Sequence, residues 1–264
     1  LWKWSKEASF YVKFSDYVQC KLCPNKCVLL DGQRGRCRTR VNFKNKLYSL
    51  SYGNPCAVHL DPIEKKPFFH FLPGTLALSI ATAGCNLRCK YCQNWEISQK
   101  KPEETRNYDL FPEKIVRLAE EEKSKNERVR TIAYTYSEPV AFYEYMVDTT
   151  KIAQKRGIRN VMITSGYLNK EPLLELSRNL DAIKIDLKGF KEKFYREVCG
   201  AELDYVLESC KIAYKNFKWV EIVNLVVPTL NDDLGELKQL CEWIKENLSK
   251  NVPLHFSRFY PHYK

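Results

Sequence analysis

The chain has 264 residues, 44% of them hydrophobic and 28% charged, which is enough for one large domain or for a domain with a small module. The formal net charge is +11, and the basic residues are scattered along the chain rather than gathered in one block. This balance suits nucleic acid, an acidic protein or an anionic substrate, and equally a plain lysine-rich surface. No run of about 18 apolar residues occurs, which argues against a membrane-spanning helix.

Cysteine usage indicates the compartment. The chain has 11 cysteines, most of them clustered at short spacings, and its first eleven residues lack the apolar segment of a signal peptide. This pattern favours metal or cluster ligation in a reducing compartment, so we expect a cytoplasmic location. The chain lacks a starting methionine and stops just after a predicted strand, so we expect trimmed ends, the C-terminus included.

The pattern of apolar and polar residues changes near residue 75. Residues 1–74 carry five cysteines and few long periodic segments, which predicts a cysteine-rich metal- or cluster-binding module. From residue 75 to 264, short apolar runs alternate with helical stretches, as in βα units around a parallel sheet. The predicted strands are 76–81, 131–136, 160–164, 182–186, 221–227 and 254–259. The predicted helices are 112–125, 139–156, 171–179, 203–215 and 235–248, and the polar stretch 94–108 is expected to be a loop.

These elements predict an α/β fold. Six βα steps are too few for a closed eight-stranded barrel and suit a partial (β/α)6 barrel. Ligands in such folds gather at the carboxyl ends of the strands, so chemistry is expected there.

One cysteine motif directly follows the first predicted strand of the barrel. Cys85, Cys89 and Cys92 have the spacing C-x3-C-x2-C. A [4Fe–4S] cluster normally takes four thiolates, so three would leave one iron open to a substrate or cofactor. The alternatives are buried packing cysteines, a zinc site with a further cysteine, and an electron-transfer cluster closed by a distant fourth cysteine. The motif and its strand-end position favour the open cluster.

With Tyr91 as the aromatic residue before the last cysteine, this motif resembles the radical S-adenosylmethionine (SAM) superfamily. The likeness covers residues 75–260 or so. The chain is also similar to the pyruvate formate-lyase activating enzyme group, and within it to the branch called the AmmeMemoRadiSam system radical SAM enzyme. The segments that carry this finer likeness are 61–67, 69–74, 92–99 and 254–261.

The resemblance implies reductive cleavage of S-adenosylmethionine at the [4Fe–4S] cluster, giving a 5′-deoxyadenosyl radical that abstracts hydrogen from a substrate. A glycyl residue of a partner protein is one candidate substrate. It also implies a reductant such as flavodoxin or ferredoxin. An RNA- or small-molecule-modifying radical SAM enzyme and a non-catalytic iron–sulfur electron-transfer protein are the alternatives, and the evidence for nucleic acid is the net charge alone.

The resemblance further implies cofactor contacts at the strand ends. Ser137 and Glu138 stand where the family has Gly-Gly-Glu-Pro, although Tyr136 and Ser137 replace the glycines; a helix start capped by Ser137 is the structural alternative. Thr164 and Ser165 stand in place of the family's Thr-Asn-Gly.

Two further strand ends match the family pattern. Asp186 and Lys188 match its Asp-Leu-Lys. They are two residues apart and so face the same way, with Lys188 able to pair with the cofactor's carboxylate or simply with Asp186. Val227 belongs to a Val-Val-Pro segment that is expected under the adenine.

A second cysteine set lies near the amino terminus. Cys20, Cys23, Cys27 and Cys37 are spaced C-x2-C-x3-C-x9-C, which could form a closed four-thiolate site for zinc or for a second [4Fe–4S] cluster. Thiolates serve both metals, so the spacing does not choose between them. The remaining cysteines are Cys56, Cys199, Cys210 and Cys241, which we expect to be mostly buried packing residues.

Overall fold

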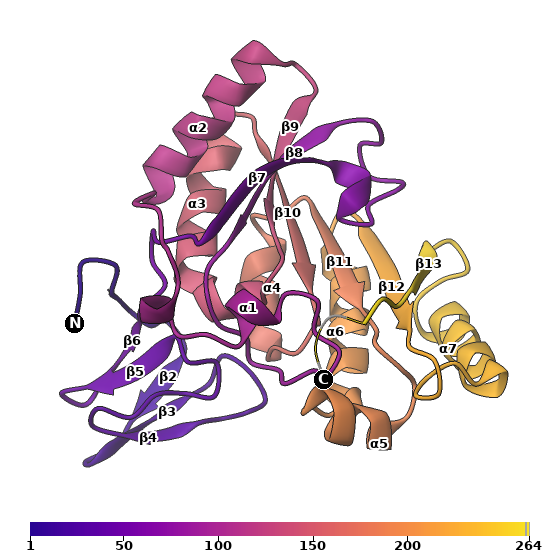
Figure 1. The fold of residues 1–264 in the computed structure, drawn as a ribbon, viewed down its shortest axis with the longest axis horizontal. Coiled ribbons are helices and arrows are strands. Elements are labelled where there is room, and N and C mark those ends of the chain that lie inside the picture. The colour runs from indigo at the N-terminus through magenta and orange to yellow at the C-terminus, as the bar shows by residue number, and fades with distance from the viewer. Residues whose placement is uncertain (262, 264) are drawn as a thin grey trace.

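The structure, a computed structural model, describes residues 1–261 and Tyr263. Its main element is a seven-stranded sheet in the order β13-β12-β11-β10-β9-β8-β7 (Figure 1). The strands are β7 (Ala57–Pro62), β8 (Leu76–Ala81), β9 (Val129–Tyr134), β10 (Arg159–Thr164), β11 (Ala182–Asp186), β12 (Val220–Val226) and β13 (Leu254–Arg258). Strands β8 to β13 are parallel, and β7 pairs antiparallel with β8. The predicted partial (β/α)6 barrel is confirmed.

Helices cover the outer face of this sheet (Figure 1). They are α2 (Pro112–Lys125), α3 (Tyr143–Lys155), α4 (Lys170–Ser177), α6 (Leu203–Asn216) and α7 (Leu234–Asn247). The cap of α7 is Asp233, whose side chain accepts the Glu236 backbone N–H at 2.9 Å. The predicted helix 139–156 is divided into a 3₁₀ turn, Pro139–Phe142, and α3.

Two short segments depart from the predictions. The stretch 94–108 is not wholly a loop, because it contains α1 (Trp95–Ser98) and a 3₁₀ turn (Pro102–Glu104). Between β11 and α6 lie α5 (Glu192–Phe194) and a π-helical turn (Tyr195–Cys199), which the sequence did not predict. Single turns bury too few residues to give a readable periodicity.

Six short strands near the amino terminus form two three-stranded sheets. One contains β1 (Lys6–Glu7), β6 (Lys46–Ser49) and β5 (Arg40–Phe43), and the other contains β2 (Tyr11–Lys13), β3 (Tyr17–Cys20) and β4 (Val28–Leu30). The proposed division of the chain after residue 74 stays a prediction. Within the first 74 residues, β7 belongs to the main sheet rather than to these small sheets.

The connection between β7 and β8 fills part of the inner face of the main sheet, and we call its residues 63–71 the plug. Phe68 and Ile63, from the connection between β7 and β8, are fully buried against small and branched side chains of four strands. These side chains are Ala77, Ala133, Val161, Ile163 and Ala182. Because this plug occupies one end of the half-barrel, space remains at the carboxyl ends.

A single carboxylate holds the plug in place. Glu221, on the inner face of β12, accepts the backbone N–H groups of Phe69, His70 and Phe71 at 3.1–3.2 Å. It also accepts the indole N–H of Trp219 at 2.9 Å, and its other contacts are His255 Nε2 at 2.7 Å and His70 Nδ1 at 3.5 Å. Burial would raise the pKa of Glu221, but these hydrogen bonds outweigh burial and hold the pKa below its ordinary value.

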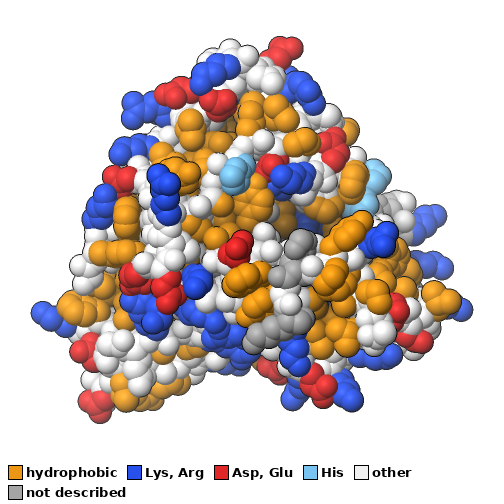
Figure 2. Space-filling model, in the orientation of Figure 1, with side chains coloured by type: hydrophobic (Ala, Val, Ile, Leu, Met, Phe, Trp, Pro, Cys, Tyr) orange, Lys and Arg blue, Asp and Glu red, His pale blue; other side chains and the backbone are white. Residues whose placement is uncertain are grey.

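Among the described residues, no helix combines the length and apolarity needed to cross a membrane. On the face shown in Figure 2, Lys and Arg side chains are interspersed with acidic and apolar ones rather than gathered in one patch. The visible surface therefore offers no single basic stripe of the kind that binds nucleic acid.

We expect Glu221→Ala to lower the free energy of unfolding by about 3 to 5 kcal/mol, because several buried donors would lose their acceptor. The matched control is Glu246→Ala, which removes an exposed carboxylate on α7 and should cost less than about 1 kcal/mol. Denaturant titration of both variants measures the difference. Equal losses in the two would show that Glu221 does not hold the plug.

Candidate active site

A cavity of about 490 Å³ opens at the carboxyl ends of the parallel strands. It lies above the plug, and its wall combines thiols, buried charges and apolar strand-end side chains. This is the place where open α/β sheets bind ligands. Its size is within the range of small-molecule sites.

The thiols of Cys85, Cys89 and Cys92 line this cavity. The Leu87 N–H donates to Cys85 Sγ at 3.3 Å, and Cys92 Sγ lies 3.2 Å from Ser98 Oγ. The loop that carries them follows β8. All three cysteines are free.

The spacing of these thiols fits a cluster better than a single ion. Among the described residues, the group of three or more metal-binding side chains with all ligand atoms within 4.8 Å is His70, Glu221 and His255, and the three cysteines form no such group. Thiolates around one zinc ion, at about 2.3 Å from it, would stand closer together. Thiolates around a cubane stand farther apart, because each ligates a different iron. The donor set thus fits a [4Fe–4S] cluster with three protein ligands.

The His70–Glu221–His255 trio is different in kind. Both oxygens of Glu221 already accept N–H donors from the plug and from Trp219, so little of its coordination capacity is left for a metal. We therefore assign these three residues to holding the plug in place.

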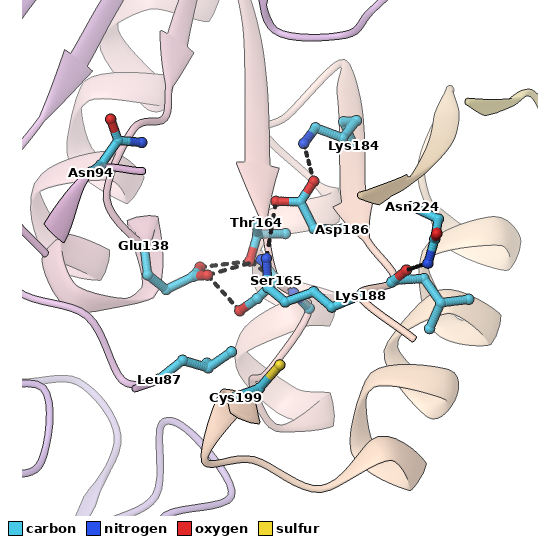
Figure 3. A network of polar contacts seen from close by, with 12 residues as sticks. Leu87, Asn94, Glu138, Thr164, Ser165, Lys184, Asp186, Lys188, Cys199 and Asn224 are labelled. Atoms are coloured by element: carbon cyan, nitrogen blue, oxygen red, sulfur yellow. Dashed lines mark hydrogen bonds and ion pairs between the residues drawn. The ribbon is translucent and has the colours of Figure 1, made fainter. Parts of the chain in front are cut away.

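Glu138 links the loop after β9 to the end of β10. Its buried carboxylate accepts the hydroxyl of Thr164 at 2.6 Å, and the N–H and hydroxyl of Ser165 at 2.9 and 2.6 Å (Figure 3). Burial raises the pKa of Glu138 despite these hydrogen bonds. The predicted residues Glu138, Thr164 and Ser165 therefore form one polar group on the cavity wall.

The loop before Glu138 has a backbone conformation typical of glycine, although the family's two glycines are replaced here by Tyr136 and Ser137. Tyr136 has φ +60°, in the left-handed region that glycine prefers. Its hydroxyl bonds to Asp61, its carbonyl accepts Asn94 Nδ2 at 2.8 Å, and Lys66 Nζ lies 4.1 Å from its ring. The Ser137 hydroxyl donates to the Thr82 carbonyl at 2.8 Å. These bonds offset the strain at Tyr136.

Asp186 lies between two lysines at the end of β11. It forms ion pairs with Lys184 and, at 3.6 Å, with Lys188 (Figure 3). Burial would raise the pKa of Asp186, but the two ammonium groups outweigh burial and lower it. Burial lowers the pKa of Lys184, whereas Asp186 and the nearby Cys89 thiol outweigh burial at Lys188 and raise its pKa. All three side chains line the cavity, with one more cation than carboxylate.

The structure brings together most of the predicted site residues. Tyr91 and Ser137 also line the cavity, but Val227 does not, and β12 instead contributes Val223 and Leu225. The sequence analysis missed Lys184, although its place two residues before Asp186 on one strand was a usable signal. Lys66, from a distant segment, was also missed; of the two polar residues His255 and Arg258 on the last predicted strand, one of which was expected to reach the site, Arg258 lines the cavity.

Cys199 adds a fourth sulfur beside the site. It is fully buried at the end of the π-helical turn, its Sγ lies 3.6 Å from the Tyr91 hydroxyl, and its proximity helps to raise the pKa of Cys89. It does not line the cavity. The expectation of buried packing holds for Cys199 and Cys210 but is wrong for Cys241, which is exposed on α7.

The amino-terminal sheets pack directly on the cysteine loop. Gly84, with φ +94°, has no room for a side chain, because a Cβ atom would lie 2.5 Å from the Cys37 carbonyl oxygen and 2.4 Å from Thr39 Cγ2. Asn25 Nδ2 donates to the Asn86 carbonyl at 2.9 Å. The position of Cys85 is thus fixed from the amino-terminal side.

Comparisons with known proteins agree with this geometry. Residues 79–244 match the model of the Radical SAM superfamily. An uncharacterized protein of Methanocaldococcus jannaschii is 46% identical over 260 residues, which cover 98% of this chain and 76% of that protein. The pyruvate formate-lyase-activating enzyme of Clostridium pasteurianum is 25% identical over 168 residues, covering 61% of this chain and 66% of the enzyme.

Two solved structures share the fold at low identity. A radical SAM methyltransferase from Sphaerobacter thermophilus aligns with a TM-score of 0.53 at 11% identity, over 97% of this chain and 66% of that chain. SuiB of Streptococcus suis aligns with a TM-score of 0.54 at 14% identity, over 71% of this chain and 41% of that chain. The chain spans less than two thirds of both, so they bear on the fold alone.

We expect Gly84→Ala to destabilise the cysteine loop, at a cost above the roughly 1 to 3 kcal/mol of the left-handed backbone itself. The matched control is Gly32→Ala, where φ is +76° but nothing lies within 4 Å of the added Cβ. Denaturant unfolding and the iron content after anaerobic reconstitution report the effect. Equal losses of stability and iron in Gly32→Ala and Gly84→Ala would contradict the claim that the Cys37 backbone fixes the cysteine loop at Gly84.

Proposed function

Because the chain belongs to the radical SAM superfamily, a family that implies a [4Fe–4S] cluster and S-adenosylmethionine, we propose that Cys85, Cys89 and Cys92 hold this cluster and that the protein cleaves S-adenosylmethionine reductively. When bound, these groups supply one-electron cleavage of a sulfonium bond and a radical that abstracts hydrogen from a substrate. The residues of this chain bind and orient them.

One observation carries the proposal. The three thiols line the same cavity as Asp186 and Lys188, at the carboxyl ends of the strands. An open iron can be chelated by the amino group and the carboxylate of an amino acid moiety, which carry opposite charges before they bind. The cavity thus provides opposite charges for both ends of such a moiety.

We assign the cofactor contacts as follows. The Lys188 ammonium binds the cofactor's carboxylate, and its raised pKa keeps it charged. Ser137 acts through its backbone, since its hydroxyl is engaged with Thr82. Glu138, Thr164 and Ser165 hold the wall in shape through their mutual hydrogen bonds. For the adenine, the cavity wall offers Val223 and Leu225, whereas the predicted contact Val227 lies outside that wall.

The identity of the substrate is a more specific part of the proposal than the cleavage reaction. A relative named as a pyruvate formate-lyase-activating enzyme and another named as a putative glycyl-radical enzyme activating enzyme support a protein substrate with a glycyl target. Reductive cleavage also requires an electron donor, for which we propose a protein such as flavodoxin or ferredoxin. The basic net charge of +11 suits an acidic partner. The division into a cysteine-rich amino-terminal module and a barrel from residue 75, and a cytoplasmic location, remain parts of the same proposal.

A second candidate function has one observation in its favour. The buried Cys199 lies close to the cysteine loop, since its carbonyl accepts the Arg88 N–H at 2.8 Å, and its thiol could close the cluster as a fourth ligand. A closed cluster would carry electrons and leave no iron for the cofactor. The absence of Cys199 from the cavity wall favours the open form.

We expect Cys85→Ala to abolish formation of 5′-deoxyadenosine from S-adenosylmethionine under strong reductant, because the cluster loses a ligand. Cys199→Ala is the matched cysteine-to-alanine control and should retain both the nucleoside and the iron load. Chromatographic assay of the anaerobically reconstituted proteins measures the nucleoside. Loss of iron from the cavity site in Cys199→Ala, with no nucleoside from the wild type, would favour the closed electron carrier instead.

A further inference from the structure

The four amino-terminal cysteines converge although they span eighteen positions of sequence. Cys20 ends β3, Cys23 and Cys27 lie in the turn before β4, and Cys37 precedes β5. Together they line one small cavity, separate from the candidate active site. All four are free thiols, so no disulfide accounts for their convergence.

Hydrogen bonds point at these sulfurs. The Arg36 backbone N–H donates to Cys27 Sγ at 3.4 Å, and Asn25 Nδ2 donates to Cys23 Sγ at 3.6 Å. The Thr39 hydroxyl lies 3.4 Å from Cys37 Sγ, although its hydrogen is donated to the Ala141 carbonyl at 2.8 Å. Donors aimed at sulfur stabilise thiolates and are the usual outer contacts of metal-bound cysteines.

A buried cation completes the cavity. Arg40 is 2% exposed and lines the same cavity. Its Nη2 donates to both oxygens of Glu144 at 2.7 and 2.9 Å. Within the described part of the chain, however, its Nε and Nη1 have no hydrogen-bond partner. Leaving buried guanidinium donors unpaired is costly, so the cavity is built for an occupant that carries negative charge.

A metal centre with four thiolates meets this requirement. Four thiolates around Zn²⁺, or around a [4Fe–4S]²⁺ core, each give a net charge of about −2 with sulfur acceptors on its surface. The distances between the four sulfurs then distinguish a zinc ion from an iron–sulfur cluster. No three of these cysteines belong to a group with all ligand atoms within 4.8 Å among the described residues. Tetrahedral zinc, with Zn–S near 2.3 Å, would require closer sulfurs.

We propose that Cys20, Cys23, Cys27 and Cys37 hold a second [4Fe–4S] cluster, with Arg40 as its buried counter-charge. Four thiolates leave no iron open, so this cluster does not bind a substrate. It lies directly behind the active-site loop, because the Cys37 backbone abuts Gly84 and Asn25 bonds to Asn86. The site does not depend on the proposed reaction.

The test removes the active-site thiols and counts what remains. The full-length Cys85→Ala/Cys89→Ala/Cys92→Ala variant is reconstituted anaerobically with iron and sulfide, in the presence of equimolar zinc. We expect roughly four iron atoms per chain, against roughly eight in the wild type, with the Mössbauer spectrum of a [4Fe–4S] cluster. Adding Cys23→Ala and Cys37→Ala should remove this iron.

The matched control is Cys241→Ser, which changes an exposed cysteine on α7 and should keep roughly eight iron atoms. Circular dichroism confirms that the triple variant is folded. One zinc and no iron in the folded triple variant would overturn the cluster in favour of a zinc site. No metal at all in that folded variant would overturn the site itself.

Discussion

The active-site loop is clamped between two parts of the chain that are remote in sequence. On one side the Cys37 backbone occupies the space in which a side chain at Gly84 would lie. On the other side the Arg88 N–H donates to the Cys199 carbonyl at 2.8 Å and the Lys90 N–H to the Val198 carbonyl at 3.0 Å. A loop without regular structure keeps three thiols in fixed positions only if its backbone is held in this way. The amino-terminal sheets and the π-helical turn both serve that purpose.

The charges inside the molecule follow from the same arrangement. Arg40 with Glu144 is a buried pair, whereas Asp186 is 30% exposed and pairs with the buried Lys184 and with the partly buried Lys188. Taking such charges out of water costs desolvation energy that hydrophobic packing would not. Asp186 and its two lysines line one cavity beside cysteine thiols, and Arg40 lines the other, where two of its nitrogens have no hydrogen-bond partner among the described residues. Both cavities therefore have donors or cations in excess of carboxylates. Anionic thiolate centres and a carboxylate-bearing cofactor would balance that excess. Stability is thus exchanged for binding, as is common at functional sites.

Much of the fold could be predicted, since buried parallel strands are short apolar runs. All six predicted strands are present, and helix α2 has the predicted bounds 112–125. The cysteines and the pair Asp186 and Lys188 could be found because the strand-end rule needs only local sequence. The family resemblance is confirmed by the match over residues 79–244.

The remainder depends on contacts between distant segments. Nothing local to Arg40 marks it as buried, because its partner Glu144 lies on α3. Nothing near Glu221 shows that it binds the plug around His70. Cys199 meets Cys89 through an unpredicted π-helical turn. Such pairings are fixed by tertiary packing, to which a single sequence gives no direct access.

The central claim is that the cluster held by Cys85, Cys89 and Cys92 keeps one iron open for S-adenosylmethionine. Electron–nuclear double resonance on the reduced protein, with the amino group of the cofactor's methionine labelled with ¹⁵N, tests it most directly. The account predicts a ¹⁵N hyperfine coupling to the cluster that persists in Cys199→Ala and is absent from Cys85→Ala. A fully loaded, reduced wild-type cluster without any coupling to the labelled cofactor would contradict it.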